Sequence, residues 1–383
     1  MQPKVHADLL VSARWILPVQ PAGLVLENQA VVIAEGRISA IGERDALLEQ
    51  YAVDEIQSRP THVLLPGFVD GAARFAARPS INHALAECLR AGITSFAAED
   101  ARVAELAAEV ASLHLRAVVS LPFSVIADRA AQSEQLWDEY RGDPYVSFCF
   151  APDRAALDDD AALTRLRSIA DELDAPIALS ASEDGARIPA PSGASSTRPL
   201  ARLDRLGLLR PGVMLHGLTT LDSRDLELVA TRSVSIVAHP MADLRRVRAF
   251  APLDMLSECG IAIAVGSGES PGQTFDVLAQ ARLAGLLNGF DAHRILHLAT
   301  LGGAQALGLA ERLGSLEPGK FADLIAVDLA TLATQVRRTE DVAQVLAFAA
   351  TRGEVTDVWL GGRPVVHHGR LLAFDEDTLL HRS

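Results

Sequence analysis

The stretch LLPGFVDGAARF (residues 64–75) marks the point at which the pattern of the chain changes. Before it, short β-rich runs follow one another. After it, apolar runs of strand length alternate with helical stretches rich in Ala, Leu and Arg. The strands that we predict in this second region are 63–69, 93–98, 115–121, 145–150, 176–181, 212–216, 234–238 and 261–266. Eight strands that alternate with helices predict a closed parallel (β/α)8 barrel of the α/β class.

Both ends of the chain are β-rich. The N-terminal runs ADLLVSA and QAVVIAEGRISAIG are strand-like, and Glu35-Gly36 lies between two of them as a hairpin turn. The C-terminal stretches GSLEPGKFADLIAVD and EVTDVWLGGRPVVHHGRLL have the same character. We therefore predict that residues 1–62 and 311–383 pair into one composite β-sandwich domain, and that residues 63–310 form the barrel.

The composition of the chain restricts its partners. The net charge of −14 and an isoelectric point near 5.2 argue against nucleic acid or an anionic membrane as a partner, since both require a basic surface. No apolar run is long enough to cross a membrane. The cysteines at 88, 149 and 259 form no CxxC pair, which fits a reducing compartment. We therefore expect a cytoplasmic protein that binds a small molecule.

Several motifs together resemble the amidohydrolase superfamily, most closely the methylthioadenosine/S-adenosylhomocysteine deaminases and chlorohydrolase-like proteins. They are LLPGFVD, ALAECLRAGITSF, RPLARLDRLGLL, LHGLTTL, HLATLGGAQALGL, GSLEPGKFADLIAVD and VTDVWLGGRPVV. The resemblance implies a distorted (β/α)8 TIM barrel, a composite β-sandwich built from both termini, and hydrolysis of non-peptide C–N bonds.

The resemblance also implies a metal site, whose ligand positions carry other residue types here. The His-x-His pair after the first strand falls on Ala72 and Arg74, the metal-binding His of strand five on Ser180, and the Asp of strand eight on Ser267. Alanine offers no donor, serine is a poor ligand and arginine repels a cation. We therefore predict no metal and no other cofactor.

Other family positions leave alternatives open. Glu183 and His216 keep the residue types of an acid/base pair, and are either catalytic or polar core residues that hold each other. Arg74 either points inward and replaces the charge of the missing metal or points to solvent. His239, at the end of strand seven, either faces the pocket or is structural. Asp153 takes the position of a substrate-contacting His after strand four.

These substitutions lead us to expect a catalytically degenerate homologue that binds a ligand or a protein partner. One alternative is a hydrolase that acts without zinc on the C–N bond of a small nucleoside- or heterocycle-like substrate. Another is a structural subunit of an active paralogue. We expect a homodimer or an assembly with such a paralogue, and the apolar helix predicted at residues 275–289 is a candidate contact surface.

Overall fold

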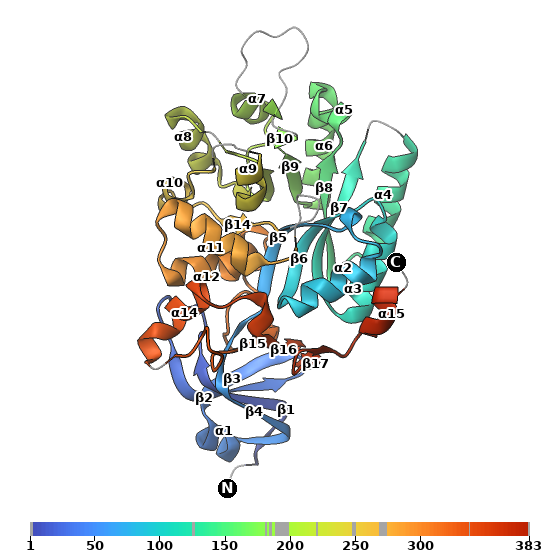
Figure 1. The fold of residues 1–383 in the computed structure, drawn as a ribbon. Helices are drawn as coiled ribbons and strands as arrows, with labels where there is room; N and C mark the ends of the chain where they lie inside the picture. The colour runs from blue at the N-terminus through green and yellow to red at the C-terminus, as the bar shows by residue number, and fades with distance from the viewer. Residues whose placement is uncertain are drawn as a thin grey trace.

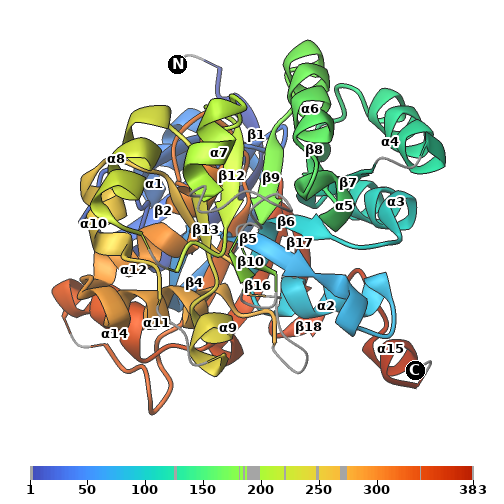
Figure 2. The ribbon, with the colours of Figure 1, turned by 90° about the horizontal axis from the view of Figure 1, so that it is seen from above.

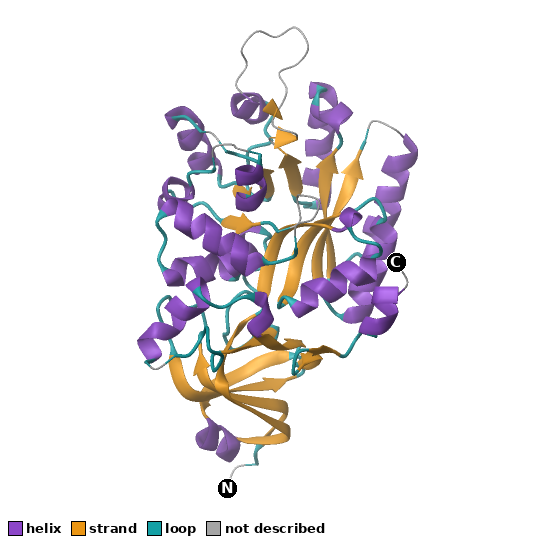
Figure 3. Ribbon diagram, in the orientation of Figure 1, coloured by secondary structure: helices purple, strands orange, loops and turns teal. Residues whose placement is uncertain are grey.

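A computed structural model describes residues 3–124, 127–180, 182–183, 186–187, 199–219, 221–246, 250–267, 274–336 and 338–381. Two eight-stranded sheets dominate this part of the chain. One is an almost closed parallel barrel surrounded by helices, and the other is a mostly antiparallel sheet at the opposite end of the molecule (Figures 1 and 3). The predicted barrel with a composite terminal β domain is confirmed.

The barrel strands follow the chain in order. They are β5 (Phe68–Arg74), β6 (Ile93–Glu99), β7 (Arg116–Phe123), β8 (Val146–Pro152), β9 (Ile177–Ser180), β12 (Val213–His216), β13 (Ser235–Ala238) and β14 (Ile263–Val265). Seven of the eight predicted strands overlap these closely. A view from above shows the strands inside a ring of helices (Figure 2). Apolar side chains fill the barrel interior, among them Val69, Val118, Met214 and Val237, so a ligand can enter only above this layer.

The first barrel strand begins later than predicted. Residues 63–65 belong to β4 (Tyr51–Pro66), which pairs with β15 (Leu324–Asp328) in the terminal sheet. The chain passes from one sheet to the other at Gly67. A Cβ atom on Gly67 would lie 2.0 Å from Oγ1 of Thr94, so this crossing requires glycine.

A side chain joins the two ends of the barrel sheet. The hydrogen-bonded order of the strands runs from β14 to β5, and these two end strands meet at a seam. Buried Asp70 in β5 accepts hydrogen bonds across this seam from the backbone N–H of Ser267 (3.1 Å) and from its hydroxyl. Next to it, a Cβ atom on Gly71 would lie 2.6 Å from Cβ of Ala264. The seam therefore depends on both a carboxylate and a glycine.

The terminal sheet contains strands from both ends of the chain. Its order is β18-β17-β16-β15-β4-β1-β2-β3. The Glu35-Gly36 hairpin is confirmed, since both residues adopt positive φ between β2 and β3. The further strands are β1 (Val5–Ile16), β2 (Leu26–Ala34), β3 (Arg37–Glu43), β16 (Val355–Leu360), β17 (Arg363–His367) and β18 (Arg370–Leu371).

The helices lie mostly outside the barrel. They include α2 (Ile81–Arg90), α3 (Val103–Leu113), α4 (Ala127–Glu139), α5 (Arg154–Leu157), α9 (Pro240–Arg245), α11 (Val277–Asn288) and α15 (Glu376–His381), with the 3-10 turn η3 (Arg352–Glu354). The remaining ones are α1 (Arg44–Gln50), α6 (Asp160–Leu173), α7 (Pro199–Arg205), α8 (Ser223–Arg232), α10 (Leu253–Glu258), α12 (Ala292–Ala299), α13 (Leu301–Ala306) and α14 (Val342–Phe348), with the short turns η1 (Phe75–Ala77) and η2 (Thr339–Asp341). Among the residues described above, no helix has the length and apolarity needed to cross a bilayer.

A buried ion pair links the two parts of the molecule. Arg116, at the start of β7, donates from Nη1 to Oδ1 of Asp323 at 2.6 Å, and both residues are buried. The Arg116 guanidinium also lies 3.8 Å from the ring centroid of Phe321. Asp323 further accepts the backbone N–H of Gly361 at 2.8 Å, so one carboxylate connects the barrel to the terminal sheet.

Helix α11 contains most of the segment that we predict as a contact surface. Val277, Leu278, Ala281 and Ala284 are buried within the chain, whereas Leu286 is 64% exposed. Neighbouring elements of the same chain therefore already cover most of the apolar surface of α11. The predicted assembly stays a prediction.

Candidate active site

A pocket lies at the carboxyl ends of the barrel strands. It has a volume of about 80 Å³. The residues that line it include Ala72, Arg74, Glu99, Ser120, Cys149, Ala178, Ser180, Met214, His216 and His239. Catalytic groups of (β/α)8 enzymes come from this end of the barrel, because loops there connect strands to helices over a packed interior. The pocket is therefore the candidate active site.

Two histidines meet in this pocket. His216 ends β12 and His239 follows β13, so neighbouring parallel strands bring them to the same level. Nδ1 of His216 lies 3.3 Å from Nε2 of His239, and the rings stack with centroids 5.6 Å apart. A Cβ atom on Gly266 would lie 2.8 Å from the His239 ring, so this glycine leaves the space that the imidazole occupies.

The two histidines differ in their surroundings. His239 is buried, and burial together with the charges of Arg74 and Arg246 lowers its pKa to about 3. His239 is therefore neutral at physiological pH, with one ring nitrogen protonated and the other a hydrogen-bond acceptor. His216 is half-buried and faces the pocket. A neutral, buried partner fixes the orientation of an imidazole that contacts the pocket.

Arg74 lies at the rim of the pocket. Its Nη2 donates to Oε2 of Glu99 at 3.1 Å, and the two side chains are 41% and 60% exposed. Glu183, which the sequence suggested as the acid/base partner of His216, ends the short strand β10 (Ser182–Glu183), which pairs with β11 (Ala186–Arg187). The side chain of Glu183 lies outside the described residues, so its role stays a prediction.

A larger cleft opens beside the pocket. It has a volume of about 960 Å³ and shares Arg74, Glu99, Ser120, Ala151 and Pro152 with the pocket. Residues of α3 and α4 form its outer wall. The shared residues make the pocket and the cleft one continuous space, so a substrate can place a small reactive group among the barrel strands and a larger remainder outside.

The remaining predicted pocket residues occupy different places. Ser180 lines the pocket beside His216, with which it is in register. Asp153 lies in the side cleft and caps α5, where its Oδ1 accepts the backbone N–H of Ala156 at 2.9 Å. Ser267 is fully buried and directs its hydroxyl to Asp70.

Sequence reasoning missed Asp70. Burial raises the pKa of this carboxyl to about 6, against the lowering effect of hydrogen bonds from Ser267 and Ala72. Its position in the sequence could have revealed it. A carboxylate that lies within the apolar run of the first barrel strand is expected to be buried and therefore requires hydrogen-bond partners inside the barrel. Cys149 also lines the pocket, but burial raises its pKa to about 11, so it does not provide a thiolate nucleophile at neutral pH.

Comparison with known proteins identifies the family to which this architecture belongs. A sequence model of the amidohydrolase family matches residues 63–365, which includes every barrel strand and most of the C-terminal sheet strands. The chain belongs to the amidohydrolase family. It is 28% identical over 409 residues to the 5-methylthioadenosine/S-adenosylhomocysteine deaminase of Teredinibacter turnerae, covering 94% of this chain and 92% of that protein. The deaminase of the same name from Saccharophagus degradans is also 28% identical, over 433 residues that cover 100% and 97%.

Solved structures agree with this placement. An adenosine deaminase from Xanthomonas campestris with bound zinc superposes with a TM-score of 0.88 at 29% identity, covering 99% of this chain and 98% of that one. An atrazine chlorohydrolase from Arthrobacter aurescens, also complexed with zinc, gives a TM-score of 0.82 at 18% identity over 98% of each chain. At that identity the second likeness shows the shared fold alone.

The expectation of a non-catalytic protein is wrong. The relatives that match nearly end to end are named as deaminases, and nothing in the described part of the site shows a non-catalytic role. The expectation rested on residue types at the inherited ligand positions alone. The residue types at those positions give no information on the contact between His216 and His239, which the fold brings together in the pocket.

The described residues at the mouth do not fit the zinc ion of these relatives. Ala72 and Arg74 offer no ligand atom for a cation, and the Ser267 hydroxyl is engaged by Asp70. The described side chains that lie close enough together to supply three ligands are His6, Asp8 and Asp54, and these are exposed on the terminal sheet. We therefore derive no catalytic step through a metal ion.

Proposed function

We propose that this protein is a hydrolase that removes the amino group of an amino-substituted, purine-like heterocycle at the barrel mouth and releases ammonia. The observation that carries the proposal is the His216–His239 pair inside a pocket of the deaminase fold. Support comes from the full-length relatives, which are named as deaminases of methylthioadenosine, S-adenosylhomocysteine and adenosine.

In this proposal His216 is the general base. It faces the pocket, and neutral His239 behind it accepts or donates one hydrogen bond that fixes the ring. The oxygen of a water molecule bonds to the ring carbon that carries the amino group, while one water proton passes to His216. When the carbon–nitrogen bond breaks, that proton leaves with the amino group as ammonia. The second water proton ends on the neighbouring ring nitrogen of the carbonyl product.

Arg74 is the candidate electrostatic group. Its guanidinium lies at the rim, where the pocket opens into the side cleft. Negative charge that develops on the attacked ring is stabilised by a fixed cation in a partly water-excluded site. The ion pair with Glu99 holds this cation in place, since both side chains come from the ends of the adjacent strands β5 and β6.

The shape of the site favours a heterocycle that carries a substituent. The inner pocket of about 80 Å³ has space for only part of a nucleoside, whereas the adjoining cleft of about 960 Å³ has space for the rest. Ala72, Ala178 and Met214 give the inner pocket an apolar side, which suits the face of a flat ring. The ion-paired Arg74 and Glu99 line both spaces and therefore lie where the pocket joins the cleft.

Ammonia release from 5-methylthioadenosine, S-adenosylhomocysteine and adenosine tests the proposal. We expect turnover by the full chain, and a loss of about 100-fold or more in kcat for His216→Asn, as removal of a general base requires. His6→Asn is a matched control, because His6 is exposed on the terminal sheet. The assay is run with chelator and with added zinc. Absence of ammonia release under both conditions, or full activity of His216→Asn, would refute the proposal.

A further inference from the structure

The outer face of α2 carries a stripe of polar side chains. His83, Glu87 and Arg90 lie at spacings of four and three residues, which places them on one side of the helix with Ala86 between them. The opposite side, which includes Ala84, Leu85 and Leu89, is buried against the barrel. The polar stripe therefore faces away from the core of the barrel.

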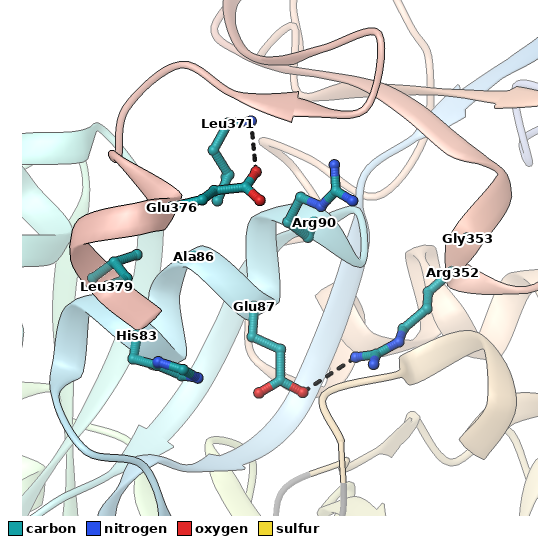
Figure 4. Close-up of a pocket in the computed structure, with 9 residues that line it drawn as sticks. All are labelled: His83, Ala86, Glu87, Arg90, Arg352, Gly353, Leu371, Glu376 and Leu379. Carbon is teal, nitrogen blue, oxygen red and sulfur yellow. Dashed lines mark hydrogen bonds and ion pairs between the residues drawn. The ribbon is translucent and has the colours of Figure 1, made fainter. Parts of the chain in front are cut away.

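The C-terminal tail covers this stripe and leaves a cavity. Its walls are α2, the turn at residues 352–353, Leu371 of β18, and Glu376 and Leu379 of α15 (Figure 4). The cavity has a volume of about 270 Å³ and lies apart from the barrel-mouth pocket, with which it shares no lining residue. At about 30 Å³ for each water molecule of liquid, the space corresponds to about nine heavy atoms.

The two carboxylates of the cavity are already bound within the protein. Glu87 accepts from Nε of Arg78 at 2.6 Å, from Nη1 of Arg352 at 3.2 Å and from the backbone N–H of Phe275 at 3.1 Å. Burial raises the pKa of Glu87, but the hydrogen bonds and charges of the arginines outweigh it and hold the pKa below its ordinary value. Glu376 accepts the backbone N–H of Leu371 at 3.2 Å.

The two arginines of the cavity form fewer hydrogen bonds within the protein than Glu87 does. Within the described part of the chain, Arg90 forms no ion pair, and Arg352 contacts Glu87 through Nη1 only. Figure 4 shows Arg90 and Arg352 on one side of the cavity and Leu379 on the other, with Glu376 between Leu379 and Arg90. Nδ1 of His83 is buried and lacks a hydrogen-bond partner among the described residues. The cavity therefore combines a cationic side with an apolar side.

We propose that this cavity binds a small organic carboxylate, with its head group on Arg90 and Arg352 and its aliphatic body against Leu371 and Leu379. Guanidinium groups match the planar carboxylate and donate charge-assisted hydrogen bonds to it. The leucines exclude water from the aliphatic part. A cationic ligand fits less well at Glu87, because this carboxylate already accepts hydrogen bonds from two arginines and a backbone N–H.

Isothermal titration calorimetry of the full chain with hexanoate tests this site. We expect saturable binding at one site per chain, and binding at least about tenfold weaker for hexanamide, which has the same length without the charge. Inorganic phosphate is expected to bind more weakly than hexanoate, because it has no apolar body. Equal binding of hexanoate and hexanamide, equal binding of phosphate, or no saturable binding of hexanoate in the millimolar range overturns the proposal.

Two variants locate the binding. Arg90→Gln is expected to weaken hexanoate binding about tenfold or more, whereas Arg141→Gln, which removes an exposed arginine beside Asp138, is expected to leave it unchanged. Leu379→Ala is expected to weaken hexanoate but not phosphate. Thermal unfolding of each variant verifies that it is folded. Unchanged hexanoate affinity in folded Arg90→Gln contradicts the assignment.

Discussion

Replacing Asp70 by asparagine tests the seam of the barrel. Burial holds the pKa of Asp70 at about 6, above its ordinary value of 3.8. At a pH below 3.8 the carboxyl is protonated in both the folded and the unfolded state. As the pH rises toward 6, the unfolded chain loses this proton and the folded protein keeps it, so the free energy of unfolding falls with rising pH.

The magnitude follows from the same two values. The interval from 3.8 to about 6 corresponds to about 3 kcal/mol at 1.36 kcal/mol for each pKa unit. In Asp70→Asn, the amide oxygen would still accept the backbone N–H groups of Ala72 and Ser267, and the amide nitrogen would donate to the Ser267 hydroxyl. About 0.5 kcal/mol of this effect is already lost at pH 4, so the wild type is expected to lose about 2.5 kcal/mol relative to Asp70→Asn between pH 4 and pH 7.

Urea unfolding at a series of pH values, followed by circular dichroism, measures this difference. Asp45→Asn is the matched control, because it makes the same chemical change at a side chain that is 89% exposed on α1. If the free-energy difference between the wild type and Asp70→Asn is constant from pH 4 to pH 7, Asp70 does not titrate as its burial requires, and the reasoning fails.

Three further perturbations test other parts of the structure. Arg116→Met leaves its partner carboxylate buried without a cation and is expected to lower the free energy of unfolding by about 3–5 kcal/mol in urea titrations; a loss below about 1 kcal/mol would show that the pair is dispensable. Gly71→Ala places a methyl group 2.6 Å from Cβ of Ala264 and is expected to cost about 1–3 kcal/mol by the same measurement, so an unchanged midpoint would mean that the seam can widen freely. Zinc added to chelator-treated protein is expected to leave the thermal midpoint unchanged, because His216 and His239 alone do not complete a tetrahedral site. A rise that saturates at one equivalent would contradict that expectation.

The sequence predicts most of the fold because its signals are local. Apolar runs of strand length, separated by helical stretches, place seven barrel strands close to their observed positions, and the Glu35-Gly36 turn follows from the positive φ that such a pair adopts. The start of the barrel is less predictable. Residues 63–68 form one largely apolar run, and only the pairing of β4 with β15 and of β5 with β6 in the structure shows that the run is divided between two sheets.

The site is harder to predict, because a family position fixes where a backbone lies and not where its side chain points. The resemblance suggested pocket roles for Asp153 and Ser267, yet one caps a helix and the other bonds a carboxylate inside the barrel. His239 gave no sign of its partner in the sequence, since residue 216 lies 23 positions earlier and only the pairing of β12 with β13 brings the rings together.

The sharing of one sheet by both chain ends has a consequence for synthesis. Strand β4 ends at Pro66 and its neighbour β15 begins at Leu324, so this edge of the nascent sheet stays unpaired until the ribosome has added the intervening barrel. At about 5–20 residues per second, that delay is on the order of 10–50 seconds. During it, the apolar end of β4 (Val63, Leu64 and Leu65) is a surface to which chaperones or other nascent chains can bind. A message that stops before residue 324 therefore yields a chain with a permanently open β edge, which quality-control proteases are expected to remove.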